Sequence, residues 1–102
     1  MDIAVSARHI ELTDPIRAYA EEKAARLPKF FDRVTEINVV VNKADHDNME
    51  VEIVASAEHT DPFVVKVVGP DMYALIDEAT DKLERQLRRH KEKLRNRKHN
   101  VQ

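Results

Sequence analysis

The longest regular pattern of apolar residues in the chain lies in its C-terminal third. Apolar side chains recur there at steps of three, four and seven residues, at Met72, Ile76, Ala79, Leu83, Leu87 and Leu94. This spacing places side chains along one face of a helix. Gly69 and Pro70 interrupt the chain just before it, and Asp71 can cap the first turn. We therefore expect a helix of about 24 residues with one apolar face.

The preceding chain shows a shorter helical pattern and four segments of strand-like alternation. A first helix is predicted from the Thr13-Asp14-Pro15 start to a stop near Pro28, about 14 residues in all. Its apolar stripe consists of Ile16, Ala20, Ala24 and Leu27. Alternating or β-branched segments predict strands near residues 2–6, 36–42, 49–57 and 63–68.

This order of elements predicts an α+β fold, β-α-β-β-β-α. A strand–helix–strand unit makes its two strands parallel with a right-handed crossover, and the next two strands add as antiparallel hairpins. Both helices then lie parallel on one face of a four-stranded sheet, with their C-termini at the same end. We expect one domain over residues 1–96 and a frayed tail over 97–102.

Composition narrows the classes of function. The 102-residue chain has no Cys and a single Gly, which excludes disulfides, Cys-ligated metal sites and a glycine-rich phosphate loop. It contains no apolar run of membrane-spanning length and no signal-peptide pattern. We expect a protein of the cytoplasm that has no membrane partner.

Charge is distributed unevenly, although the net charge is only −2. Residues 82–102 hold nine Lys and Arg against two Glu, a balance of +7, and residues 1–81 hold eight against seventeen acidic residues, a balance of −9. This asymmetry favours an anionic partner at one end of the molecule, although a solvated charged helix is the alternative.

The cations of the last helix form two rows that flank its apolar stripe. One row consists of Lys82, Arg85, Arg89 and Lys93, and the other of Arg88, Lys91 and Arg95. Rows of this kind suit two phosphate backbones and predict strong salt dependence. Because the chain has no aromatic platform on a strand, we expect recognition of folded RNA by shape.

The segment 26–33 is predicted to be a loop that carries a second group of cations. Arg26, Lys29 and Arg33 flank the adjacent Phe30 and Phe31, of which at least one is expected in the core. Since both helices end at the same edge of the sheet, these cations should lie beside the basic half of the last helix.

Histidines near carboxylates do not form a convincing metal site. His46 and His59 lie in turns at opposite ends of a strand of about nine residues, which separates them by roughly 30 Å. Each turn is explained better by Asp and Asn side chains that hydrogen-bond to their own backbone. His9 and His90 have no evident partner. We expect no catalytic site, cofactor, metal or small-molecule substrate.

Three segments resemble a known family, the ribosome hibernation promoting factors and ribosome-associated inhibitor A proteins. The segment DMYALIDEATDKLERQLRRHKEKL, residues 71–94, is similar to that family's signature, and LPKFFDRV, residues 27–34, and ELTDPIRAYAEEKAARL, residues 11–27, are further matches. The resemblance covers essentially the whole chain. It implies a fold similar to double-stranded-RNA-binding domains.

The resemblance also implies a function. Family members bind the small ribosomal subunit over the A and P sites and exclude mRNA and tRNA. Carried onto this chain, the contacts with ribosomal RNA fall on Lys82, Arg85, Gln86, Arg89 and Lys93, with Arg26, Lys29 and Arg33 alongside. Asp71 is then a helix cap, Asp77 and Asp81 are structural, and Tyr73 lies near the basic face or the core.

Some features depart from the family or leave an alternative open. The fourth strand, VVKVVG, is bulkier than in many relatives, and the C-terminal dimerisation domain of long relatives is absent, so the chain corresponds to a short form or to one domain of a long form. Off the ribosome we expect a monomer. The alternative function is a protein-binding modulator of an alternative sigma factor, with Glu36, Glu50 and Glu52 of the sheet as its contact.

Overall fold

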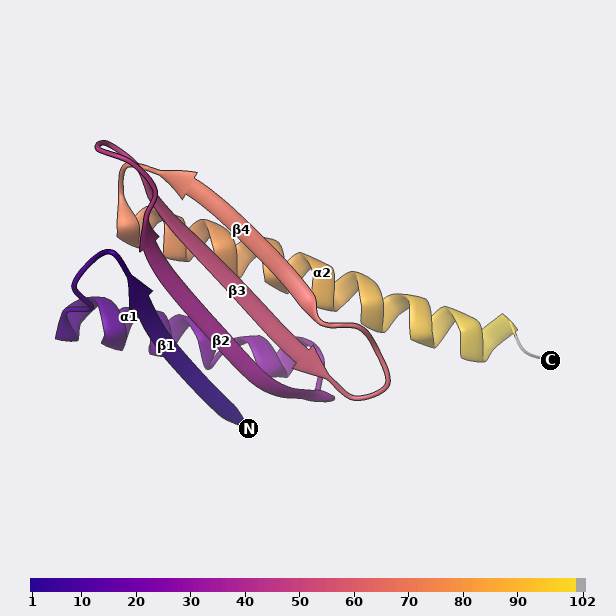
Figure 1. Ribbon diagram of the computed structural model, residues 1–102. Helices are drawn as coiled ribbons and strands as arrows, with labels where there is room; N and C mark the ends of the chain where they lie inside the picture. The colour runs from indigo at the N-terminus through magenta and orange to yellow at the C-terminus, as the bar shows by residue number, and fades with distance from the viewer. Residues whose placement is uncertain (101–102) are drawn as a thin grey trace.

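The computed structural model describes the backbone of residues 1–100 and the side chains of residues 1–96. The elements run in the order β1 (Asp2–Arg8), α1 (Asp14–Ala24), η1 (Leu27–Phe30), β2 (Val34–Lys43), β3 (Met49–Ala57), β4 (Phe63–Gly69) and α2 (Met72–Asn100). The predicted β-α-β-β-β-α fold is therefore confirmed (Figure 1). The side chains of 97–100 and all of 101–102, where a frayed tail is expected, lie outside the described residues.

Helix α1 begins where the sequence indicates but ends earlier than the predicted stop near Pro28. The Thr13 hydroxyl accepts a hydrogen bond of 3.3 Å from the Ile16 amide, and Pro15 occupies the first turn, where an N–H is not needed. The helix has 11 residues, fewer than the expected 14 or so. The chain then tightens into the 3₁₀ turn η1, with Pro28 near its start, so the prediction of a plain loop over 26–33 was wrong.

The four strands form one sheet in the order β1-β2-β3-β4. Strand β1 pairs with β2 in parallel, and the other two pairs are antiparallel, as the crossover argument predicts. Inward side chains alternate along each strand, and those of β2 and β3 are the most deeply buried. The first strand is longer than expected, because residues 7 and 8 continue its pairing with β2.

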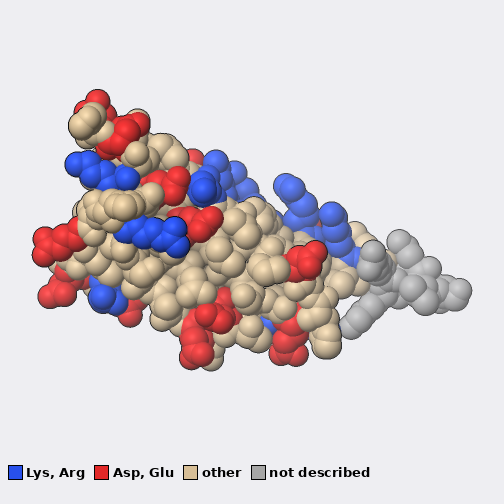
Figure 2. Space-filling view, viewed as in Figure 1, with Lys and Arg blue, Asp and Glu red and all other residues tan. Residues whose placement is uncertain are grey.

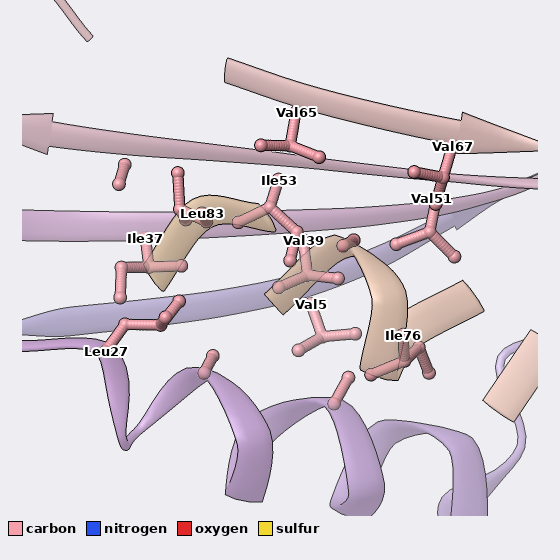
Figure 3. Close-up of a cluster of buried hydrophobic side chains, with 14 of the residues drawn as sticks. Val5, Leu27, Ile37, Val39, Val51, Ile53, Val65, Val67, Ile76 and Leu83 are labelled. Atoms are coloured by element: carbon pink, nitrogen blue, oxygen red, sulfur yellow. The ribbon is translucent and has the colours of Figure 1, made fainter. Parts of the chain in front are cut away.

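Both helices cover the same face of the sheet, and the core lies between the two layers (Figure 1). Helix α2 packs on β3 and β4, whereas α1 packs on β1 and β2. Side chains from both layers meet there, including Ile37 and Ile53 of the sheet and Leu27, Ile76 and Leu83 of the helical layer (Figure 3). The apolar stripe predicted for α2 is buried from Met72 to Leu87, and Leu94 is half-buried.

Helix α2 is longer than the sheet it covers. It has 29 residues, more than the 24 or so expected, and starts from Asp71, whose carboxylate accepts hydrogen bonds from the Tyr73 and Ala74 amides. Among its described side chains the last fully buried one is Leu87, and His90 still contacts Phe63 at the edge of the sheet. The remaining helix projects by about 15 Å, which gives the molecule its 56 Å long axis. No helix in the described part of the chain is long and apolar enough to cross a membrane.

Candidate nucleic-acid interface

The cations of α2 lie on the solvent side of the helix, from its middle to its projecting part. Figure 2 shows Lys and Arg side chains gathered along one edge of this projection. Exposed members of both predicted rows are Lys82, Arg85, Arg88, Arg89, Lys91, Lys93 and Arg95. We call these seven side chains, together with Lys29, the cationic ridge. Because the apolar stripe faces the core, the ridge is free to contact a large anionic partner.

Some of these cations already have carboxylate partners on their own helix. Lys82 Nζ lies 3.2 Å from a Glu78 oxygen, and Arg88 Nη2 lies 3.2 Å from a Glu84 oxygen, in pairs four residues apart. Such exposed pairs contribute little free energy and can be exchanged for a phosphate. Within residues 1–96 the remaining α2 cations of the ridge, from Arg85 to Arg95, make no ion pair.

The predicted meeting of the two basic segments takes place around the ring of Phe30. The Arg88 guanidinium carbon lies 4.7 Å from the ring centroid, and Lys29 Nζ lies 5.2 Å from it. Cations at this range are attracted by the negative face of an aromatic ring. Phe30 thus joins η1 to α2 and holds two cations side by side, while Phe31 is buried in the core as expected.

The other two cations of the 26–33 segment occupy different surroundings. Arg26 pairs with Glu22 at 3.1 Å on its own helix. It lines a cleft of about 60 Å³ whose opposite side is formed by Asp81 and Glu84, so it faces acidic residues and not the cationic ridge. Arg33 is exposed just before β2, and its carbonyl accepts a hydrogen bond from the Glu58 amide.

Gln86, which the family resemblance assigns to RNA, has an intramolecular contact. Its side-chain nitrogen donates a hydrogen bond of 3.4 Å to the Val64 carbonyl on the outer edge of β4. Edge strands expose unpaired backbone groups, which proteins commonly cover. Gln86 therefore covers part of this edge, a role that the sequence does not reveal.

A polar cluster joins α1 to the first half of α2. The Tyr19 hydroxyl donates a hydrogen bond to Asp77 Oδ1 at 2.5 Å, and Lys23 Nζ lies 3.2 Å from the same oxygen. The hydrogen bond from Tyr19, and then the nearby Lys23, hold the pKa of Asp77 below its usual range. The same hydrogen bond, with burial and the Asp77 charge, raises the pKa of Tyr19. Asp77 is structural, as predicted.

Tyr73 belongs to this cluster and to neither of the places expected for it. Its ring packs edge-to-face on Tyr19 with the centroids 5.2 Å apart, and 42% of its surface stays exposed. It lies in the first, acidic part of α2, far from the cationic ridge. Edge-to-face packing of two aromatic rings stabilises the contact between the helices.

His90, for which the sequence offered no partner, packs between two core aromatics. Its ring lies 5.1 Å from Phe31 and 5.3 Å from Phe63, both in edge-to-face geometry. It connects α2 to the segment after η1 and to the start of β4. This histidine therefore anchors the helix at the point where the projection begins.

The turn histidines lie far apart, as predicted. Asp45 accepts hydrogen bonds from the Asp47 and Asn48 amides, which lower the pKa of its carboxyl and account for the turn. His59 adopts a φ of 62° in the turn between β3 and β4. Across the described residues, no group of three or more His, Asp and Glu side chains is arranged to hold a metal ion.

Comparisons with known proteins show the family and the fold of the chain. The family model for sigma 54 modulation protein / S30EA ribosomal protein matches residues 3–95. A ribosome hibernation promoting factor of Pseudomonas putida is 39% identical over 91% of this chain and 89% of its own length, and one of Escherichia coli K12 is 37% identical over 93% and 98%. The crystal structure of the Thermus thermophilus Protein Y N-terminal domain superposes with a TM-score of 0.78 at 35% identity, over 88% of this chain and 99% of that one. The chain belongs to the family of sigma 54 modulation proteins and S30EA ribosomal proteins.

Proposed function

We propose that this protein is a non-catalytic ribosome hibernation factor of the cytoplasm. In this proposal it binds the small ribosomal subunit through ribosomal RNA, occupies the channel of mRNA and tRNA, and so inhibits translation in idle ribosomes. The proposal is supported by relatives that carry the name ribosome hibernation promoting factor and are 37% to 39% identical over most of the chain.

The observation that carries the proposal is the cationic ridge. Along α2 the cations Arg85, Arg89 and Lys93, which make no ion pair with the described side chains, follow one another every four residues, which spaces them by about 6 Å along the axis. Arg88 and Lys29 add a second line of charge at Phe30. A row of this kind contacts consecutive phosphates and releases their counterions.

The shape of the molecule supports binding in a channel. The core and the His90 contact hold α2 as far as residue 90, so the projecting last third can enter a groove in folded RNA without unfolding the domain. Recognition by backbone charge and shape is the usual mode for structured RNA. The RNA contacts proposed are those of the cationic ridge, together with Gln86, Arg26 and Arg33.

A pair of charge-reversal variants tests the RNA contact. Arg89→Glu with Lys93→Glu should abolish co-sedimentation with purified small subunits, whereas Arg8→Glu with Lys43→Glu should leave it intact. The second variant makes the same change in net charge at the opposite end of the sheet. Equal loss in both variants, or no loss in either, would contradict the proposal.

A competition experiment tests the channel itself. Small subunits that already hold mRNA and initiator tRNA should bind the protein at least tenfold more weakly than empty subunits. Undiminished binding to the loaded subunits would place the protein outside the channel. Size-exclusion chromatography of the free protein tests the expected monomer.

A further inference from the structure

The sheet has a second face, which the helices leave uncovered. Figure 1 shows α1 and α2 on one side only. Strand alternation directs every second side chain to the other side. We call these outward side chains the open face; they are Asp2, Ala4, Ser6, Arg8, Glu36, Asn38, Val40, Asn42, Glu50, Glu52, Val54, Ser56, Val64, Lys66 and Val68.

An apolar line crosses the open face. Val54 of β3 lies directly opposite Val64 of β4, and Val40 of β2 is a diagonal neighbour of Val54. Val64 and Val68 are 51% and 55% exposed, which makes them two of the most exposed large apolar residues in the described part of the chain. This line gives a partner an apolar surface to cover.

Carboxylates border the apolar line, and two of them are side by side. Asp2 and Glu36 are register partners on β1 and β2, so two like charges face each other, an arrangement that destabilises a sheet. Glu52 lies beside Val54 on β3. Among the described residues Asp2, Glu36 and Glu52 make no ion pair, and the one pair on this face joins Lys66 and Glu50 at 4.0 Å. Its four carboxylates stand against two cations, Arg8 and Lys66, so the face carries a net charge of −2.

One polar atom on this face also lacks a donor. The Asn42 side chain donates from Nδ2 to Glu50 at 3.5 Å, but its Oδ1 is buried and accepts no hydrogen bond within the described residues. A buried acceptor without a donor costs free energy. A lysine or arginine side chain of a partner would supply the donor once the Asn42 side chain rotates and exposes this oxygen.

The edge strands of the sheet are less accessible to a binding partner than its open face. Arg17 Nη1 reaches the Val5 carbonyl of β1 at 3.5 Å, and Gln86 reaches the Val64 carbonyl of β4. A helix side chain thus covers one backbone acceptor on each edge strand, which disfavours addition of another strand. A partner is therefore expected to use the side chains of the open face.

We propose that the open face is a protein-docking surface for a basic polypeptide segment in which Lys or Arg alternates with aliphatic residues. The aliphatic side chains cover Val40, Val54 and Val64, and the cations pair with Glu36 and Glu52. The protein then has two faces of opposite selectivity: the cationic ridge takes an anionic polymer, and the open face takes a cationic one. This inference does not rest on the RNA-binding proposal.

The charge of the face separates this partner from other occupants. RNA is repelled by the unpaired carboxylates. A second copy of the chain has an open face of the same sign, so face-to-face pairing brings like charges together. A basic segment removes the repulsion between Asp2 and Glu36.

Nuclear magnetic resonance titration of the ¹⁵N-labelled protein tests the proposal. The probe is a short synthetic peptide of alternating lysine and valine, with an alternating glutamate and valine peptide as control. The lysine peptide should shift amides of β2, β3 and β4 and leave α2 unchanged, and the glutamate peptide should shift no amide of these three strands. Glu36→Gln with Glu52→Gln should weaken the affinity about fivefold or more, whereas Glu21→Gln with Glu92→Gln on the helices should not.

Four results would overturn the proposal. The first two are that the saturating lysine peptide shifts no amide, or that it shifts amides of the helices only. The other two are that both peptides bind the open face with equal affinity, or that the Glu36/Glu52 and Glu21/Glu92 double variants bind the lysine peptide equally well. Two further titrations identify other occupants. Shifts on the open face that appear on concentrating the protein alone would assign it to a second copy, and shifts there with a double-stranded RNA oligonucleotide would assign it to RNA; either result contradicts the proposal.

Discussion

The hydroxyl of Tyr19 on α1 and Oδ1 of Asp77 on α2 are 2.5 Å apart, although 58 residues separate them in the chain. Lys23 joins the same oxygen from one turn further along α1. This contact fixes how the two helices lie beside each other. The direction of α2 in turn decides where its projecting cations are presented.

Removing the Tyr19 hydroxyl should weaken this contact and change how the stability of the protein depends on pH. We expect Tyr19→Phe to lower the midpoint of thermal unfolding by a few degrees at neutral pH. Since the pKa of Asp77 is lowered, its contribution is present above the ordinary carboxyl value of 3.8 and is lost as the pH falls through the folded value. Since the pKa of Tyr19 is raised, its contribution is present below 10.0 and is lost as the pH rises through the folded value.

The difference between wild type and Tyr19→Phe should therefore be largest between these two limits and shrink at acid pH. Tyr73→Phe is the matched control, because the Tyr73 hydroxyl makes no hydrogen bond within the described residues. Thermal melts followed by circular dichroism across the pH range measure both variants. A pH-independent difference for Tyr19→Phe would argue against the contact.

The boundary between the anchored and projecting parts of α2 can be measured with two leucines. Leu87 is fully buried and Leu94 only half-buried. We expect Leu87→Ala to lower the free energy of unfolding by about 3 kcal/mol, through lost burial and the cavity left behind, and Leu94→Ala by less than about 1 kcal/mol. Urea denaturation gives both values. Similar losses would mean that the helix is held by the core along its whole length.

Phe30 offers a test of the meeting of the two basic segments. Phe30→Leu keeps an apolar side chain but removes the ring face shared by Lys29 and Arg88. We expect it to weaken binding to small subunits about threefold at constant salt slope, because each cation–π contact at an exposed site contributes about 0.5 to 1 kcal/mol. Filter binding at several salt concentrations checks this. Arg88→Lys keeps the positive charge but replaces the guanidinium over the ring. Its affinity for small subunits therefore separates the effect of the ring contact from the effect of the charge.

The sequence predicted the layers of the fold better than the contacts between them. The spacing from Met72 to Leu87 indicated which face of α2 is buried, because burial follows helical periodicity. It could not show that His90 packs between Phe31 and Phe63, since those rings come from two other segments. The end of α1 was also misjudged, because Leu27 continues the apolar spacing of the helix although it lies in the 3₁₀ turn η1.

The same difference between patterns within one element and contacts between elements applies to the candidate interface. The rows of cations on α2 could be predicted from residue spacing alone. The predicted topology placed Lys29 beside the basic half of α2, where Arg88 lies. The different surroundings of Arg26 and the use of Gln86 on the β4 edge depended on side-chain packing between elements. Glu36, Glu50 and Glu52 do share the outward face of the sheet, as strand alternation requires.

The salt dependence of binding to purified small subunits tests the central claim most directly. If the cationic ridge replaces counterions on RNA phosphates, the logarithm of the affinity should fall linearly with the logarithm of salt concentration, with a slope of roughly −4 to −7. Arg89→Glu with Lys93→Glu should make that slope shallower by about 1.5 to 2, and Arg8→Glu with Lys43→Glu should leave it unchanged. A slope near zero for the wild-type protein, or the same slope in the ridge variant, would contradict the account.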